Sequence, residues 1–411
     1  MKINYCRNNL LAAAAALALL VNQASAATFT WTGASSGGWS DAGNWTGGVP
    51  AVANTSDVII SGTLNVGNNY AGGSYTVRSL TFDDTNDATF SLSLSATLNS
   101  GSGSRTLTFS SDSGNATLSV AAGSTGDKII NRVGTGTSSV ILTSSLDINH
   151  NGSGTVIFGT QSVITGAGGI NKSGTGTLTL SGANTYTGNT LVSAGKIVLG
   201  NALALQNSAY DTASVNGGLD VTGYPTPTLG GLSGSVNLTS TLITGYDSIS
   251  TLTLNPQTGI TNTYSGDVGN GNGSMALTKT GSGTQVLSGT NTYTGNTLVS
   301  AGKIVLGNAL ALQNSAYDTA SVNGGLDVTG YPTPTLGGLT GSANLTTALI
   351  TGYDSISTLT LNPQTGITST YSGDVGNGNG SMALTKTGAG TQVLSGANTY
   401  TGPTTISGGV L

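Results

Sequence analysis

Several residue types that most folds use are scarce or absent in this chain. Its 411 residues include no glutamate, so all 16 acidic residues are aspartates, and charged residues make up only 7% of the sequence. There is one histidine, His150, and one cysteine, Cys6. Straight-chain helix formers are few, whereas threonine, valine and isoleucine are plentiful. This balance predicts strands and turns rather than helices.

These absences exclude several kinds of chemistry. A single histidine cannot supply a His-x-x-x-His metal site. With Cys6 near the start as the only cysteine, the rest of the chain has no disulfide. A glycosidase would have to use two aspartates as its acid and base. We therefore predict that the chain is not an enzyme and has no catalytic residue, metal ligand or cofactor. The net charge of −5, without basic clusters, predicts no nucleic-acid partner.

The first residues have the pattern of a secretory signal. Lys2 and Arg7 precede an apolar run over residues 10–21, and the Ala-Ser-Ala sequence ending at Ala26 fits a signal-peptidase site. We predict cleavage between Ala26 and Ala27 and export of the remainder. The apolar run is too short to span a bilayer, and no longer run follows, so we expect no transmembrane helix in the mature chain.

What the chain does contain is repetition. Residues 181–287 recur as residues 288–394, and a third copy begins at residue 395 and runs to residue 411. The two full copies differ at seven positions: Ala183/Thr290, Ser233/Thr340, Val236/Ala343, Ser240/Thr347, Thr241/Ala348, Asn262/Ser369 and Ser282/Ala389. Repetition of this kind indicates stacked units, and a 107-residue unit is long enough for several turns of a solenoid.

Short apolar runs punctuated by Gly, Asn, Ser and Pro indicate the strands of these turns. In the first copy and just before it, the pattern predicts strands at Thr177–Leu180, Thr190–Ser193, Lys196–Leu199, Val215, Leu219–Val221, Val236–Leu238, Leu242–Ile243 and Leu252–Leu254. We predict an all-β fold, a right-handed parallel β-helix with about 20–30 residues per turn. An array of β-sandwich-like units is the alternative, because ~100 residues also suit one sandwich.

One motif identifies a resemblance to a known family. Residues 172–188, Lys-Ser-Gly-Thr-Gly-Thr-Leu-Thr-Leu-Ser-Gly-Ala-Asn-Thr-Tyr-Thr-Gly, resemble the autotransporter-associated β-strand repeat, and the motif recurs in residues 277–295 and 384–402. Residues 228–234 and their copy 335–341 resemble the linking turns between such repeats, and the Trp-rich opening resembles the segment ahead of them. The resemblance implies a β-helical passenger at, or released from, a bacterial cell surface.

A complete autotransporter would also have a C-terminal translocator barrel. The chain instead stops within the motif, at residues 408–411, and also lacks an apolar sorting tail. Either the sequence is a fragment, beyond whose end a translocator barrel is possible, or the protein uses another export route, and we favour the fragment. We divide the chain into a signal (1–26), an N-terminal β region with a Trp-rich cap (27–165) and β-strand repeats (166–411).

Four local patterns suggest sites, but each has a plainer interpretation as a turn. His150 lies among turn residues, so we expect it to be exposed in a turn. Asp83, Asp84 and Asp87 form the densest acidic cluster, and we expect a solvated turn between two strands. Residues 33–37 match Gly-x-Ser-x-Gly without the strand and helix that a nucleophile elbow requires. Residues 269–273, Gly-Asn-Gly-Asn-Gly, lack the aspartate spacing of a calcium loop.

Trp31, Trp39 and Trp45 are the three tryptophans of the chain. They are expected either to seal the first turn of the solenoid as a cap or to stack on sugar rings. Three functions therefore stay open: a structural or adhesive scaffold, a glycan-binding surface protein that uses these tryptophans, and a β-helical polysaccharide lyase or hydrolase. The partners we expect for the first are a host surface, matrix, glycan or like chains.

Overall fold

The computed structural model describes residues 27–32, 41–50, 56–61, 69–70, 74–83, 90–93, 105–131 and 138–411. The predicted signal, with Ala26 at its end, lies outside these residues, and Ala27 is the first described residue. Within the described part there is no α-helix, and its three 3-10 helices have three residues each. No helix of this part is long and apolar enough to cross a membrane.

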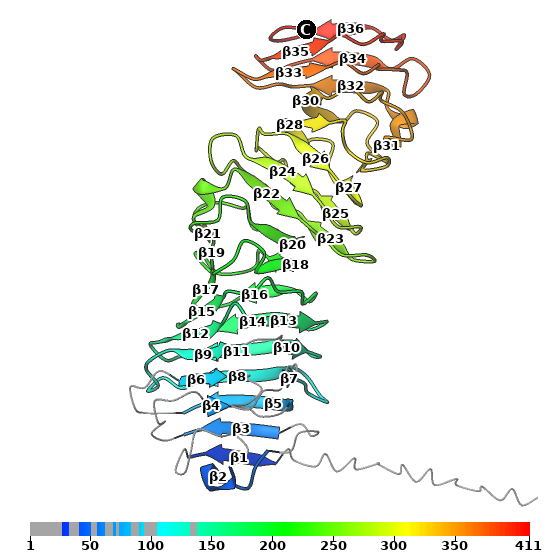
Figure 1. Ribbon diagram of the computed structural model, residues 1–411. Helices are drawn as coiled ribbons and strands as arrows, with labels where there is room; N and C mark the ends of the chain where they lie inside the picture. Colours follow the sequence, from blue (N-terminus) through cyan, green and yellow to red (C-terminus); the bar gives the residue numbers. More distant parts are fainter. Residues whose placement is uncertain are drawn as a thin grey trace, which may run out of the picture.

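The strands stack one above another into an elongated rod that bends along its length (Figure 1). Among the described strands, the pairs other than the antiparallel pair β1–β2 are parallel, with partners in successive turns. The predicted all-β parallel solenoid is therefore confirmed. The β-sandwich alternative is wrong, because sandwich sheets are antiparallel.

The part before the duplication contains β1 (Thr28–Trp31), η1 (Ala42–Asn44), β2 (Trp45–Thr46), β3 (Ser56–Ile60), β4 (Asn69–Tyr70), β5 (Tyr75–Phe82), β6 (Phe90–Ser93), β7 (Arg105–Phe109), β8 (Ala116–Val120), β9 (Lys128–Asn131), β10 (Ser138–Leu142), β11 (Leu146–His150), β12 (Thr155–Phe158), β13 (Ser162–Gly166), β14 (Ile170–Ser173) and β15 (Thr177–Leu180). From β7 to β15, each turn has three strands. They form the stacks β7–β10–β13, β8–β11–β14 and β9–β12–β15.

The first 107-residue unit contains β16 (Thr190–Val192), β17 (Lys196–Leu199), β18 (Leu205–Asp211), β19 (Leu219–Asp220), β20 (Thr228–Ser233), β21 (Ile243–Thr244), η2 (Tyr246–Ser248), β22 (Thr251–Leu254), β23 (Thr261–Tyr264), β24 (Ala276–Lys279) and β25 (Thr284–Leu287). The second contains β26 (Thr297–Val299), β27 (Lys303–Leu306), β28 (Leu312–Asp318), β29 (Leu326–Asp327), β30 (Thr335–Thr340), β31 (Ile350–Thr351), η3 (Tyr353–Ser355), β32 (Thr358–Leu361), β33 (Thr368–Tyr371), β34 (Ala383–Lys386) and β35 (Thr391–Leu394), and β36 (Thr404–Ile406) follows.

Each unit makes five turns of two strands. Stacked partners lie 20 residues apart at Thr190 and Tyr210 and 25 apart at Leu229 and Leu254, since 210 − 190 = 20 and 254 − 229 = 25. These spacings confirm the predicted turn length. Alternation gives many of the short strands an inward apolar set, as in β15, where Leu178 and Leu180 are buried.

One of the two sheets is interrupted once in every unit. The sheet that begins at β4 ends at β21, and a new sheet of five strands runs from β23 to β31. The interruption recurs 107 residues later, where β33 begins another sheet with β35. In Figure 1 the strands after this joint are turned relative to those before it. We refer to β20, β21 and β23, and their copies β30, β31 and β33, as the joint.

The predicted linking turns at residues 228–234 and 335–341 are wrong, because β20 and β30 are buried strands. Their glycines serve close packing instead. A Cβ on Gly230 would lie 2.1 Å from the carbonyl carbon of Asn207 in the turn below. The predicted strands at Val215 and Val236 are also wrong, since both side chains are exposed in loops between strands.

Candidate functional site

Trp31 and Trp45 meet at the start of the described rod. β1 and β2 pair in antiparallel register, and this pairing brings the two indoles into an edge-to-face contact with ring centroids 5.0 Å apart. Their exposed fractions are 1% and 8%, so neither ring presents a face to solvent. This geometry suits a seal over the core. Trp39 lies outside the described residues.

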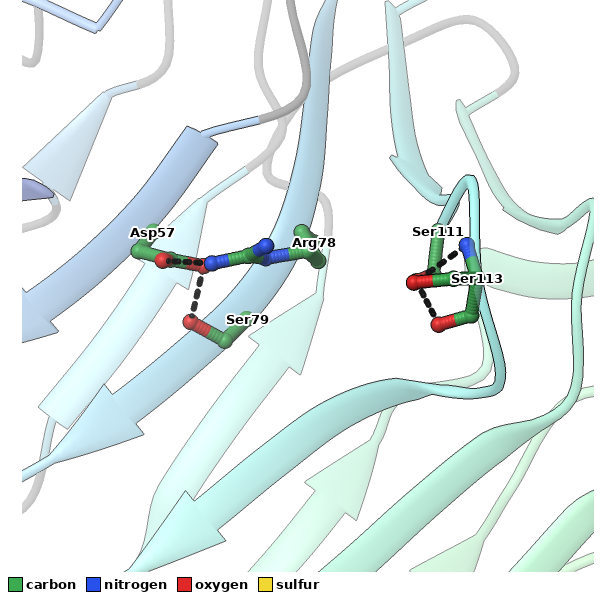
Figure 2. A network of polar contacts seen from close by, with 5 residues as sticks. All are labelled: Asp57, Arg78, Ser79, Ser111 and Ser113. Carbon is green, nitrogen blue, oxygen red and sulfur yellow. Dashed lines mark hydrogen bonds and ion pairs between the residues drawn. The ribbon is translucent and has the colours of Figure 1, made fainter. Parts of the chain in front are cut away.

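An ion pair lies on the outside of the neighbouring turns, between β3 and β5 (Figure 2). Asp57 accepts hydrogen bonds from Arg78 through both carboxylate oxygens and from the Ser79 hydroxyl at 2.7 Å. Burial raises the pKa of the Asp57 carboxyl, but these hydrogen bonds and the Arg78 charge outweigh it and hold that pKa below its usual value. The same view shows the Ser111 hydroxyl bonded to the Ser113 carbonyl oxygen within a turn. The first arrangement links the side chains of two neighbouring strands, and the second closes a turn.

The predicted acidic cluster is only partly visible. Asp83 is exposed directly after β5, whereas Asp84 and Asp87 lie outside the described residues, as do residues 33–37 with the Gly-x-Ser-x-Gly match. In the turn at residues 269–273, Asn270 Oδ1 accepts hydrogen bonds from the amides of Met275 and Thr294. Among the described residues, no group of three His, Cys, Asp or Glu side chains could hold a metal ion.

His150 is not an exposed turn residue, contrary to the prediction. It is the last residue of β11 and only 1% exposed, because alternation along Leu146, Ile148 and His150 points all three inward. Its Nδ1–H donates to the carbonyl oxygen of Thr177 at 3.0 Å, so Nε2 carries the lone pair. Within the described structure, Nε2 is buried without a hydrogen-bond partner. Burial lowers the pKa of His150.

A buried lysine lies at or next to the end of a strand in each copy of the repeat motif, in β14, β24 and β34. Lys172 Nζ donates to the carbonyl oxygens of Ser173, Gly174 and Ala194, at 2.7, 2.8 and 3.3 Å. Lys279 and Lys386 make the equivalent three contacts in their own turns. Burial lowers the pKa of Lys172 and of Lys279 to about 8, so the ammonium form persists at neutral pH.

The Asn-Thr-Tyr part of the motif also points inward. Asn184 Oδ1 accepts from the amide of Ile164 in the turn below, and Nδ2 donates to the carbonyl oxygen of Ala204 in the turn above, at 2.9 and 3.0 Å. Tyr186 bonds to Thr190, which in turn bonds to Ser208. We call Asn184, Tyr186 and Thr190, with their copies Asn291, Tyr293 and Thr297, the polar rungs. Composition alone did not reveal these rungs, although the recurring Asn-Thr-Tyr-Thr-Gly sequence marks where they are.

Comparisons with known proteins agree with this geometry. A family model described as the passenger-associated-transport-repeat matches residues 170–199, 277–306 and 384–411. These segments cover the lysine-capped turns and the polar rungs. An alignment that covers 36% of this chain shows 32% identity to the adhesin BmaC autotransporter of Brucella suis biovar 1 (strain 1330). The chain spans about 4% of the length of that relative. No solved structure matches this chain. This chain is therefore a parallel β-solenoid that carries three passenger-associated transport repeats and is distantly related to an autotransporter adhesin.

Proposed function

We propose that this chain is an exported, non-catalytic scaffold of the bacterial cell surface or extracellular space, and that its outer faces adhere to other surfaces. The observation that carries the proposal is the position of the three transport repeats on regular turns of the rod. The inward polar groups there bond to the backbone of their own or neighbouring turns. They therefore serve the rod itself, and its binding surface lies outside.

The partner classes are inferred from the adhesin relationship. A relative that is named an adhesin supports a host surface or matrix as the partner, and the repeated faces also suit like chains. The same relationship supports export to the cell surface or release from it. The boundary proposed between residues 165 and 166 falls inside β13, which is the last strand of its stack, and the first turn of two strands is β16–β17.

Adhesion is tested with purified residues 27–411 coupled to beads. We expect these beads to bind host cells, extracellular matrix or one another more than uncoated beads do. The matched control carries Leu254→Asp and Leu361→Asp, which place carboxylates in the core and unfold the rod while changing only two residues of the sequence. If the folded chain binds no better than this control in any of the three assays, the adhesive proposal fails.

The glycan-binding alternative depends on Trp39, because Trp31 and Trp45 are buried. Trp39→Ala and Trp45→Ala separate the two roles on a glycan array. For a cap, we expect Trp45→Ala to lower thermal stability and Trp39→Ala to leave glycan signals unchanged. Loss of a glycan signal in a stable Trp39→Ala variant would favour the alternative. The polysaccharide-degrading alternative is tested by incubating the chain with pectin and other acidic polysaccharides and measuring new reducing or unsaturated ends.

A further inference from the structure

We propose that the 107-residue unit is an interchangeable length module, so that the rod is lengthened or shortened by whole units without changing the turns on either side. The proposal concerns how the turns fit together and is independent of what the rod binds. Four features of the structure support this proposal: the contacts at the start of each copy, the turn on which each copy stacks (its platform), the positions at which the copies differ, and the period of the interrupted sheet.

Every copy of the unit begins with the same contacts to the turn below. The first amide of each copy donates to a strand-end carbonyl oxygen there, in the pairs Ser181–Phe158, Ser288–Tyr264 and Ser395–Tyr371, at 2.9, 2.9 and 3.0 Å. The asparagine three residues later accepts from a backbone amide of that turn, in the pairs Asn184–Ile164, Asn291–Val268 and Asn398–Val375, at 2.9, 2.7 and 2.9 Å. The three starts therefore share these two contacts.

The platforms beneath these starts differ in sequence. The first copy stands on residues 158–180, which precede the duplication, whereas the second and third stand on the last turns of a unit. The unit accepts both, because the contacts use backbone atoms that every platform offers. The chain therefore already contains a unit placed on two different supports.

The differences between the copies avoid the interior. Of the seven differing positions, only Asn262/Ser369 is buried, and it lies in the joint rather than at the boundary between units. Asn262 Nδ2 donates to the carbonyl oxygen of Gly230 within the same unit. The side chains buried at the boundary, such as Tyr186 and Tyr293, are identical between copies. The one difference at the lower boundary is Ala183/Thr290, where the Thr290 hydroxyl adds a hydrogen bond of 3.3 Å to Asp267 of the preceding unit. The buried side chains of the upper and lower faces are otherwise the same in both units.

The interrupted sheet has the same period as the unit. The sheet from β23 to β31 has five strands, two from the first unit and three from the second, and each unit has five turns. Adding or removing a whole unit therefore leaves the next joint at the same distance, five turns, from the one before it. At about 4.8 Å per turn, one unit adds on the order of 24 Å to the rod.

The test is to delete residues 288–394, which joins Leu287 directly to Ser395. We expect the Ser395 amide to donate to the Tyr264 carbonyl oxygen in place of Tyr371, and Asn398 to accept from the Val268 amide in place of Val375, as Ser288 and Asn291 do in the intact chain. Small-angle X-ray scattering should show a maximum dimension shorter by about 24 Å. Urea unfolding should stay cooperative, with an m value smaller by about a quarter, in proportion to the residues removed. Duplicating residues 288–394 should lengthen the rod by the same increment.

The matched control deletes residues 288–375, which removes four turns and stops inside the unit. It brings Lys386 into the turn directly above Lys279, so two buried ammonium groups lie in adjacent turns. We expect this variant to lose cooperative unfolding or to aggregate. If both deletions fold equally well, the module is the single turn and the proposal is wrong. If the whole-unit deletion fails to fold or does not shorten the rod by the expected increment, the proposal is also wrong.

Discussion

At the scale of single residues, buried polar side chains supplement the apolar core by bonding to backbone atoms of their own and neighbouring turns. A two-strand turn leaves corner amides and carbonyls without a ladder partner, and a buried unpaired group costs roughly 1–3 kcal/mol. Asn184 satisfies one amide below it and one carbonyl above it. Lys172 does the same for three carbonyls at a Gly turn. The recurrence of these residues in the motif thus has a structural cause.

The exposed Asn398 of the third copy provides a control for the buried Asn184. Asn184→Ala should lower the free energy of unfolding by about 2–3 kcal/mol, because two buried backbone groups lose their partners. Asn398 makes the equivalent bond to Val375 but is exposed, so Asn398→Ala should cost less than about 1 kcal/mol. Urea unfolding of both variants measures the difference. Equal losses would show that the asparagine acts through local turn propensity.

His150 should make stability depend on pH in mildly acidic solution. Burial lowers its pKa in the folded state, and the nearby Lys172 and Lys128 charges lower it further, while Thr177 and Asp127 oppose them. The unfolded chain therefore binds a proton first as pH falls below 6.5. We expect stability to be fully present above pH 6.5 and to decrease below it, down to the folded-state pKa.

A variant isolates this histidine, which is the only one in the chain. His150→Gln keeps a donor for the Thr177 carbonyl oxygen but does not titrate. Unfolding free energies of both proteins between pH 7 and pH 5 should show a flatter profile for the variant. Parallel profiles would mean that His150 is solvated in the folded state.

At the scale of elements, the joint is held largely by side chains. β20 pairs with β22 at only two positions, Thr228–Thr253 and Leu229–Leu254. Beyond them, Gln285 reaches across 53 residues and bonds to both the amide and the carbonyl oxygen of Leu232, at 2.9 and 3.0 Å. Its copy Gln392 repeats this contact. The buried Gln285 side chain thus supplies the hydrogen bonds that a neighbouring strand would otherwise make to Leu232.

Removing the Gln285 side-chain amide should destabilise the joint locally and leave the turns beyond it unchanged. In Gln285→Ala, we expect the Leu232 amide to exchange its hydrogen at least about tenfold faster, because about 1.4 kcal/mol of local protection corresponds to tenfold. Amides of β26 and β27 should keep their protection. Val286→Ala, which removes the next and outward-facing side chain, is the control. Unchanged exchange at Leu232 would show that the backbone alone holds the joint.

At the scale of the whole molecule, buried phenols and ammonium groups make stability depend on pH in alkaline solution. Burial raises the pKa of Tyr186, Tyr210, Tyr293, Tyr317 and Tyr371 to about 12, and also raises the pKa of Tyr246, Tyr264 and Tyr353. The unfolded chain ionises first, near pH 10, so this contribution is lost as pH rises above 10. Lys172 and Lys279 act in the opposite direction between about pH 8 and pH 10.5, because the folded state releases their protons first.

The two effects together predict a stability maximum close to pH 10 and cooperative unfolding above it. Tyrosinate absorbance near 295 nm should then appear together with the loss of the β-sheet circular dichroism signal. A chain already unfolded in urea should titrate earlier, near pH 10. Tyrosinate absorbance that develops well before the circular dichroism changes would show that the phenols are accessible in the folded rod.

Local alternation was sufficient to predict much of this molecule. The fold class, the length of a turn and strands such as Thr177–Leu180 and Lys196–Leu199 follow from period-two patterning between Gly-rich turns, because each strand buries its own apolar set. The duplication and the family resemblance were also visible in the sequence. All of these properties can be recognised from continuous segments of the sequence, without knowing which segments contact one another.

Only the tertiary structure decided which segments stack, and therefore what several residues do. β20 has the composition of a turn, yet Gly230 is buried against the turn below. His150 has turn residues after it, yet it faces inward. Gln285 finds its partner 53 residues away, and Trp31 meets Trp45 through a strand pair. The physical reason is that these contacts join different turns, and a local pattern does not specify which turn lies above or below.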